Sequence, residues 1–462
     1  MVSRKLILRT LVISAIAILF LTVCTTTAGD QPIADALARS GRVVGGALLV
    51  MIAFYAIPVF FLRRRWHRVK QRRDMENDQR ARVIDRFMRN TPALSGALTI
   101  VYATLIAFFA HLIAPDASPY AGDQINELAY KPPGFRIEVL EVPLELKPAK
   151  VGFVRALLYG RPSGSRTIPI TGHRFEGDSL YVMRYIGEGV QGRQLAFALH
   201  EITGMQASTE EQVQQIRSAH LGNKTFLLGT DDLGRDFLSR IILGTRVSLS
   251  VGIVAVVIAL CIGIPLGALA GFYKRYPPVV RLPGKRRWKF PVDNSIMWMI
   301  NIIWSIPTLL LVFPIVFAFG QQFYTIFIAV GLTMWVDIAR MVRGQVMQVR
   351  EMEFVQATRT FGYSDNRAIW RHILPNISGP IIVITAANFA YAILTEAGLS
   401  FLGIGVQPPA PSWGLMIAKY KDNLITDPYL ALMPGFAITL LVLAFFMVGN
   451  GLRDALDIRS RW

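Results

Sequence analysis

The sequence contains few of the residues that build disulfide frameworks, metal centres and charged surfaces. Its 462 residues include only 2 cysteines and 6 histidines, and 17% are charged. Cys24 and Cys261 both fall in or beside apolar runs, so they cannot frame a disulfide scaffold. The histidines do not cluster along the chain.

Motifs that bind nucleotides or metals are also missing. No G-x-x-x-x-G-K-[ST] occurs, and PGKRR at 283–287 lacks both the upstream glycine and the hydroxyl. HEITG at 200–204 lacks the second histidine of a zinc-binding helix, and GIGVQPP at 403–409 lacks the third glycine of a dinucleotide fingerprint. We therefore expect no catalytic residue, no metal and no cofactor in this chain.

Long apolar runs are what the sequence has in abundance, since 53% of its residues are hydrophobic. They gather into blocks of about 20 residues, the length of a helix that crosses a bilayer. These blocks predict an all-α multi-pass membrane protein. Eight spans are expected, at 6–23, 43–62, 93–114, 248–273, 294–319, 323–342, 379–400 and 430–449.

The net charge of +18 is distributed unevenly between the segments that join these spans. Five segments on one side (1–9, 63–92, 274–293, 343–378 and 453–461) carry 29 Lys and Arg residues. The short segments on the other side (24–42, 320–322 and 401–430) carry 4. Because short basic loops stay in the cytoplasm, both termini are expected inside. The charge needs no nucleic acid to explain it.

The expected location is a bacterial inner membrane, where the basic segment 63–92 would lie against anionic lipid headgroups. LTVC at 21–24 has the outline of a lipoprotein cleavage site, but Val23 is bulky where a small residue is wanted. Whether the first span is cleaved stays open.

A small β-rich insertion is expected at 115–228, outside the membrane. FRIEVLEVPLELK and SLYVMRYIG alternate apolar and polar residues between Pro and Gly, as half-buried strands do. Its role stays open between a docking surface and an inert insertion.

The segment GTDDLGRDFLSRIILGTRVSL at 229–249 predicts a helix on the outer membrane surface. Thr230 or Asp231 could cap it, and the carboxylates of its first turn suit the positive end of the helix dipole. The spacing lacks the pattern of a calcium loop. The residues assigned to this surface helix are Gly229, Thr230, Asp231, Gly234, Arg235 and Asp236.

Few ionisable residues interrupt the spans. Asp337 and Arg340 are three residues apart and are expected to pair with each other. Glu396 stands near the outer end of the seventh span, and it and Asn388 are candidates for the transport pathway. Two isolated carboxylates do not predict a convincing proton path.

A polar and basic stretch, EFVQATRTFGYSDNRAIWRHILP at 353–375, lies between two apolar runs. Its pattern predicts two short amphipathic helices hinged at Gly362, which can take the left-handed conformation that ends the first. Ser364 can cap the second helix, and Pro375 is expected to close it. The result would be a two-helix elbow on the cytoplasmic side.

The two faces of the predicted elbow differ. Phe354, Ala357, Thr358 and Phe361 follow helical spacing and are expected to face the spans. Gln356, Arg359 and Asp365 are expected to face water, where a partner could push on them.

This stretch resembles the EAA loop of binding-protein-dependent ABC import permeases. Gln356, Ala357 and Thr358 take its first three positions and Gly362 its glycine, with Leu374 and Pro375 at the end. Three positions depart from the pattern. The segments around it (229–249, ARMVRGQV at 339–346, HILPN at 372–376 and EAGLSFLGIGVQPPAPSWG at 396–414) resemble the C-type permease subunit of the dipeptide and oligopeptide importers.

The resemblance implies a six-helix permease core, with 93–114 as its first span and 229–462 as the rest, including the coupling loop 343–378. The two N-terminal spans with their basic linker, 1–92, and the 115–228 insertion would be additions to it. The residues implied to couple the chain to an ATPase are Phe354, Val355, Gln356, Ala357, Thr358, Arg359, Gly362, Asp365, Leu374 and Pro375.

The implied partners are a sister permease subunit, two cytoplasmic ATPase subunits that would hold ATP and magnesium, and a periplasmic substrate-binding protein. The chain itself would then be no enzyme, and ATPase motion would drive alternating access for a peptide. Whether the cargo is a dipeptide, an oligopeptide, a peptide antibiotic or a metal complex stays open. The alternatives are an ion-coupled secondary transporter or channel that works alone, and a membrane-anchored signalling protein.

Overall fold

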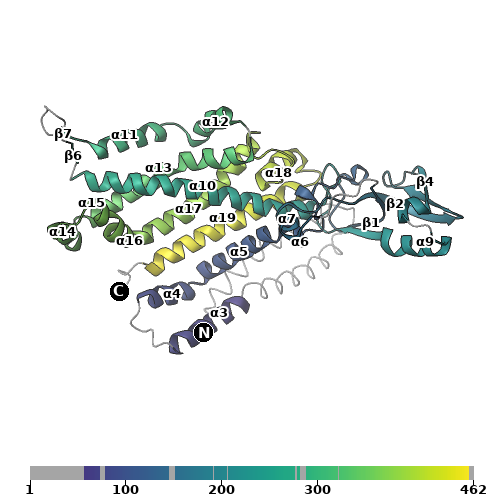
Figure 1. The fold of residues 1–462 in the computed structure, drawn as a ribbon, viewed down its shortest axis with the longest axis horizontal. Coiled ribbons are helices and arrows are strands. Elements are labelled where there is room, and N and C mark those ends of the chain that lie inside the picture. The colour runs from purple at the N-terminus through teal and green to yellow at the C-terminus, as the bar shows by residue number, and fades with distance from the viewer. Residues whose placement is uncertain are drawn as a thin grey trace.

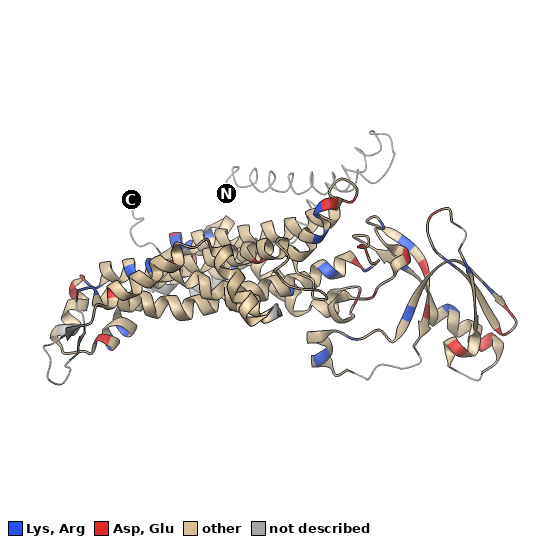
Figure 2. Ribbon diagram, turned by 90° about the horizontal axis from the view of Figure 1, so that it is seen from above, with Lys and Arg blue, Asp and Glu red and all other residues tan. Residues whose placement is uncertain are grey.

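The computed structural model of the chain describes residues 57–72, 79–144, 151–190, 192–204, 207–275, 278–280, 288–320 and 322–456. Long helices lie side by side in one elongated body, and a sheet projects from one end of it (Figure 1). Charged residues gather at the two ends, while the middle of the body is almost free of them (Figure 2). This distribution is that of a protein with an apolar belt in a bilayer.

Within the described residues, five helices are long and apolar enough to cross a membrane. They are α5 (Thr91–Phe108), α10 (Phe237–Tyr273), α13 (Phe323–Val349), α17 (Ser378–Phe401) and α19 (Tyr429–Leu456). They confirm the predicted spans near these positions. The predicted span 6–23 lies outside the described residues, and 43–62 enters them only at its end, in α3 (Ile57–Arg72).

The predicted span at 294–319 is bent. It is a pair of helices, α11 (Val292–Trp304) and α12 (Thr308–Phe319), which meet at an angle of 91°. Pro307 has no N–H to donate and disfavours helical backbone at Ile306, so the helix stops there. Counted as one span, this pair gives six in the described part of the chain.

The most extensive contact between described helices joins α10 to α13. Gly263, Gly267 and Gly271, four residues apart on α10, lie directly against α13. A Cβ at Gly263 would lie 2.8 Å from the Trp335 carbonyl oxygen, and one at Gly271 would lie 2.8 Å from that of Arg343. Such small residues let two membrane helices approach backbone to backbone, which maximises their van der Waals contact.

The sheet at the other end of the body is antiparallel, with strand order β4-β3-β2-β1-β5. It lies inside the predicted insertion. Its core is formed by Leu140, Ile170, Leu180 and Val182 together with Leu199, Ile202 and Ile216 from the helices that cover it. The strands are β1 (Phe135–Pro143), β2 (Ser165–Glu176), β3 (Ser179–Arg184), β4 (Gln194–Ala198) and β5 (Leu221–Phe226).

Shorter elements complete the fold. Around the sheet and its base are α6 (Ala110–Ile113), α7 (Phe153–Tyr159), α8 (Leu199–Thr203) and α9 (Thr209–Gln215). Near the opposite end are α4 (Gln79–Arg89), the strands β6 (Val279–Val280) and β7 (Trp288–Lys289), and α14 (Glu353–Thr360). Between α14 and α17 come α15 (Asp365–Arg367), a π-helical turn, η6 (Ala368–Ile373), and α16 (Leu374–Asn376). The helix α18 (Trp413–Tyr420) precedes α19.

The predicted surface helix at 229–249 is wrong in its first half. Residues 229–236 form a buried turn, closed by a bridge between Thr230 and Asp236, and α10 begins only at Phe237 with Asp236 as its cap. Gly229 and Gly234 both have positive φ values, of 73° and 69°, which interrupt a helix. From Phe237 onward the segment is the first part of one continuous 37-residue helix.

Asp231 organises this turn. Its carboxylate is fully buried and accepts hydrogen bonds from the backbone N–H groups of Leu233 and Arg235, at 2.9 and 3.0 Å. It also accepts one from the Arg235 side chain at 2.7 Å. Arg235 and Asp236 are buried as well. The turn ties the base of the sheet to the start of α10.

We predict that Gly234→Ala destabilises the protein far more than Gly177→Ala. Both glycines have positive φ, so each alanine costs about 1–2 kcal/mol of backbone strain. A Cβ at Gly234 would also collide with the carbonyl oxygen of Ile125, whereas Gly177 has open space around it. Thermal unfolding of the detergent-solubilised variants measures the difference. Equal midpoints would contradict the account of this turn.

Candidate functional site

The elbow predicted at 353–375 extends to residue 377 in the structure and lies at the end of the helical body opposite the sheet (Figure 1). Arg350 holds its start in place. The Arg350 guanidinium is buried and donates to the carbonyl oxygens of Gly271 and Phe272 at the end of α10. Because a cation suits the negative end of a helix dipole, this contact locks the last turn of α10 to the residue that follows α13.

An ion pair braces the same end of the body. Arg343 of α13 and Asp293 of α11 make a two-pronged contact, with N–O distances of 2.5 and 2.9 Å. Paired hydrogen bonds of this geometry are among the strongest that side chains form. The elbow therefore starts from a junction of three helices.

The elbow buries one side against this junction. Val355, Ile369, Ile373 and Ile377 are at most 2% exposed and belong to the same core as residues of α10 and α13. Thr358 is also buried, and its hydroxyl donates to the Val355 carbonyl oxygen at 2.7 Å. The inner face of α14 is thus formed by Val355 and Thr358.

The predicted inner face was wrong for the aromatic residues. Phe354 is 41% exposed and Phe361 78% exposed, and Trp370 on η6 is 52% exposed. Ala357 is exposed too. The sequence pattern identified the amphipathic helix but assigned the aromatic residues to the membrane side, because it could not show which face the spans would cover.

The hinge has the predicted geometry. Gly362 has a φ of 72°, and the N–H of Tyr363 donates to the Thr358 carbonyl oxygen at 3.1 Å, which is the bond of a Schellman helix end. Nothing lies within 4 Å of where a Cβ would be, so glycine is required by the backbone angle and not by packing. The Ser364 hydroxyl caps α15, as predicted, by accepting from the Arg367 N–H.

Pro375 does not close the second helix as predicted. It stands in the first turn of α16, where a missing N–H is tolerated, and the chain stays helical through the π turn before it. The break comes two residues later at Ile377, whose φ and ψ are −103° and 12°. Leu374 is buried, while Pro375 is exposed.

The other predicted coupling residues lie on the same short segment. Gln356 is exposed, and its side chain donates to the Glu351 carbonyl oxygen at 3.0 Å. Asp365 is half-buried in the first turn of α15. The backbone of Arg359 lies in α14, but its side chain is outside the described residues. The elbow thus brings all of the predicted coupling positions together.

The two pathway candidates both lie on α17 and are buried. The Asn388 amide donates to the Ile384 carbonyl oxygen at 2.9 Å, a local bond within the helix. Glu396 is 1% exposed and accepts from the Ser400 hydroxyl at 2.7 Å. Gly414 at the start of α18 leaves room for its second oxygen. Both side chains are therefore buried among their neighbours and are not exposed to a transport pathway in this conformation.

Arg340 contacts residues of α11 instead of the expected partner, Asp337. The Arg340 guanidinium stacks over the Trp304 ring, 4.0 Å from its centroid, and reaches the Asn301 side chain at 3.5 Å. Asp337 is exposed. Arg340 therefore joins α13 to α11, beside the bend.

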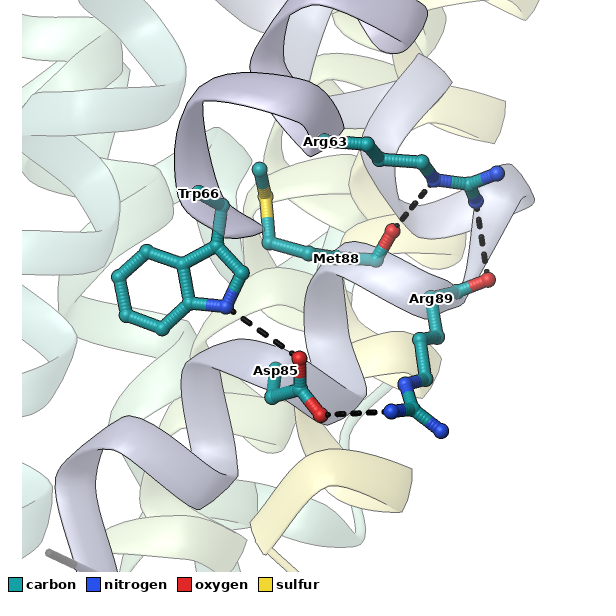
Figure 3. A pocket seen from close by; sticks show the side chains of 5 residues that line it. All are labelled: Arg63, Trp66, Asp85, Met88 and Arg89. Atoms are coloured by element: carbon teal, nitrogen blue, oxygen red, sulfur yellow. Dashed lines mark hydrogen bonds and ion pairs between the residues drawn. The ribbon is translucent and has the colours of Figure 1, made fainter. Parts of the chain in front are cut away.

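A pocket of about 190 Å³ lies between α3 and α4, lined by Arg63, Trp66, Asp85, Met88 and Arg89 (Figure 3). Its polar groups are bonded to one another. Arg63 donates to the Met88 and Arg89 carbonyl oxygens at 2.7 and 2.9 Å, and the Trp66 ring donates to Asp85 at 3.3 Å. These contacts hold α3 and α4 together at the pocket.

At the sheet end, Asp232 joins the buried turn, of which it is a part, to α18. Burial disfavours its charge, but Lys419 at 2.7 Å and the Tyr420 hydroxyl at 2.7 Å outweigh that effect and lower the pKa of the carboxyl. In the described part of the chain, no group of three His, Cys, Asp or Glu side chains is arranged so that it could hold a metal ion. The aspartates of this turn are thus used in structural contacts.

Comparison with known proteins assigns the membrane core of the chain to a family. The family described as "Binding-protein-dependent transport system inner membrane component" matches residues 263–462. The chain is 37% identical to a glutathione transport system permease protein, GsiD, of Pectobacterium atrosepticum over 230 residues, which are 50% of this chain and 71% of the relative.

Two further relatives match a similar share of the chain. A dipeptide transport system permease protein, DppC, of Alkalihalophilus pseudofirmus is 41% identical over 233 residues (50% of this chain, 72% of the relative). An oligopeptide transport system permease protein, OppC, of Bacillus subtilis is 38% identical over 239 residues (52% of this chain, 73% of the relative). This chain therefore belongs to the family of inner membrane components of binding-protein-dependent transport systems.

Proposed function

We propose that this chain is the permease subunit of an ATP-driven peptide importer, and that the elbow is where a separate ATPase grips it. The observation that carries the proposal is the two-sided elbow. One side is rooted in the junction of α10, α11 and α13, and the other exposes Phe354, Phe361 and Trp370 to a partner. Exposed aromatic side chains beside a fixed core are typical of the anchors of protein interfaces.

The elbow end faces the cytoplasm in this proposal, with both termini on that side. The basic segments predicted to be cytoplasmic, 63–92 and 343–378, contribute α3, α4 and the elbow, which lie toward that end of the body. The sheet end then faces the periplasm, where a substrate-binding protein would deliver its cargo. Peptide as the cargo rests on the names of the relatives.

The remaining partners are proposed on the same basis. A sister permease would complete the pathway beside α17, and two ATPase subunits would supply ATP and magnesium, for which this chain has no motif. ATPase closure would push the exposed face of the elbow. Since its root is continuous with α13 and locked to α10, that push would move the two helices together and switch the access of the pathway.

We predict that Phe361→Asp weakens association with the ATPase by at least about 30-fold, the effect of losing an interface anchor worth about 2 kcal/mol. The matched control is Ile425→Asp. Ile425 is 94% exposed, but it follows α18 and therefore lies at the sheet end of the body, away from the elbow. Co-purification titrations of the two variants measure the effect. An unchanged affinity for Phe361→Asp, or an equal loss in both variants, would contradict the proposal.

We also predict that Gly362→Val abolishes coupled uptake while the protein still inserts in the membrane. A β-branched residue at a φ of 72° is strained by about 1–2 kcal/mol, so the hinge would change shape. Gly177→Val is the control, because Gly177 also has a positive φ, of 55°, with no atom within 4 Å of its Cβ position, but lies between β2 and β3 in the sheet. Peptide uptake and ATP hydrolysis are measured together.

The expected outcome for Gly362→Val is hydrolysis without uptake, with both retained in the control. Normal uptake by the variant would count against the coupling role of the elbow. Uptake by the purified chain without any ATPase would favour an ion-coupled transporter instead.

A further inference from the structure

The short helix α7 exposes a large apolar surface at the base of the sheet. Phe153, Val154, Leu158 and Tyr159 are 65%, 66%, 46% and 66% exposed, and only Ala156 and Leu157 are buried. A cluster of this kind on one short helix marks a contact with a membrane or another protein. Two contacts fix where this helix lies.

The first contact is made by Arg246 of α10. Its guanidinium donates to the carbonyl oxygens of Leu157 and Leu158, at 3.1 and 2.6 Å, near the end of α7. It also donates to those of Ala107 and Phe108, at 2.8 and 3.0 Å, at the end of α5. One side chain therefore holds α7 level with the last turn of a membrane-spanning helix.

The second contact fixes the orientation of α7. Gly160, which follows its last residue, has a φ of 81°, and a Cβ there would lie 2.7 Å from the Ala117 carbonyl oxygen and 3.0 Å from the His111 ring. The next residue, Arg161, donates its N–H to the same Ala117 oxygen at 2.8 Å. The backbone leaving α7 is thus packed on the segment that follows α6.

The apolar surface of α7 continues that of its neighbours. Phe108 and Phe109, where α5 ends, and Leu112 and Ile113 of α6 are 54%, 38%, 49% and 51% exposed. The helices α6 and α7 are in contact and lie beside each other where the helical body meets the sheet (Figure 1). Since α5 is long and apolar enough to cross the bilayer, α7 lies at the level where this crossing ends, next to further exposed apolar residues.

We propose that α7 lies in the bilayer leaflet at the sheet end, at the boundary between phospholipid headgroups and acyl chains. Phe153, Val154 and Leu158 enter the acyl region, and Tyr159 lies at the headgroup level that aromatic residues with a polar tip prefer. The helix thereby anchors the sheet domain to the membrane.

Spin labelling tests this proposal on the full-length chain in liposomes of phosphatidylethanolamine and phosphatidylglycerol. In a background of Cys24→Ser and Cys261→Ser, labels are placed by Phe153→Cys and Leu158→Cys. Leu105→Cys on α5, 48% exposed, is the reference in lipid. Glu210→Cys, exposed on α9 at the far end of the sheet domain, is the reference in water. Collision rates with oxygen, which concentrates in lipid, and with a water-soluble nickel chelate are measured.

The expected result is that labels at 153 and 158 collide with oxygen about as often as the label at 105, and with the nickel chelate severalfold less often than the label at 210. Frequent collisions with nickel would place α7 in water and overturn the proposal. Rare collisions with both reagents would mean that protein covers α7, which would overturn it as well. Because no ATPase or cargo is present, none of these outcomes bears on the proposed transport function.

Discussion

The close packing of α10 on α13 is the constraint on which the rest of the structure depends. Three glycines of α10 bring the two backbones into contact, with Gly267 directly against the carbonyl oxygen of Ala339. Membrane helices gain little from the hydrophobic effect when they associate, so contact of this kind supplies the attraction. At one end the pair leads into the buried turn below the sheet, and at the other it ends in the Arg350 contact and the elbow.

This arrangement gives the elbow the properties of a lever. Its root, including Val355 and Ile373, belongs to the core that α10 and α13 share, so it cannot move without them. Its hinge at Gly362 has open space around it, and its aromatic residues are partly to largely exposed among the described residues, with Phe361 78% exposed. On a family member that has no nucleotide motif of its own, this is the surface on which we propose that an external energy source acts.

Local chemistry made parts of this structure predictable, and long-range packing decided the rest. The helix end at Gly362 and the cap at Ser364 followed from residues within the turn itself. The orientation of Phe354 could not be predicted from the sequence. Both faces of α14 carry apolar residues, and only the position of the core decides which face is buried. The segment around Asp231 was predicted to be helical because its charges suit a first turn, whereas two positive-φ glycines and distant partners fold it into a buried turn.

The claim that an ATPase grips the elbow is tested most directly by crosslinking from Ala357 in intact cells. Ala357 is exposed on α14, so a photoreactive amino acid at this position leaves the root of the elbow undisturbed. The same amino acid at Ile425, after α18, reports on non-specific capture. The account predicts a crosslink to a nucleotide-hydrolysing protein from position 357 and none from position 425. Capture of no such protein from position 357 would contradict it.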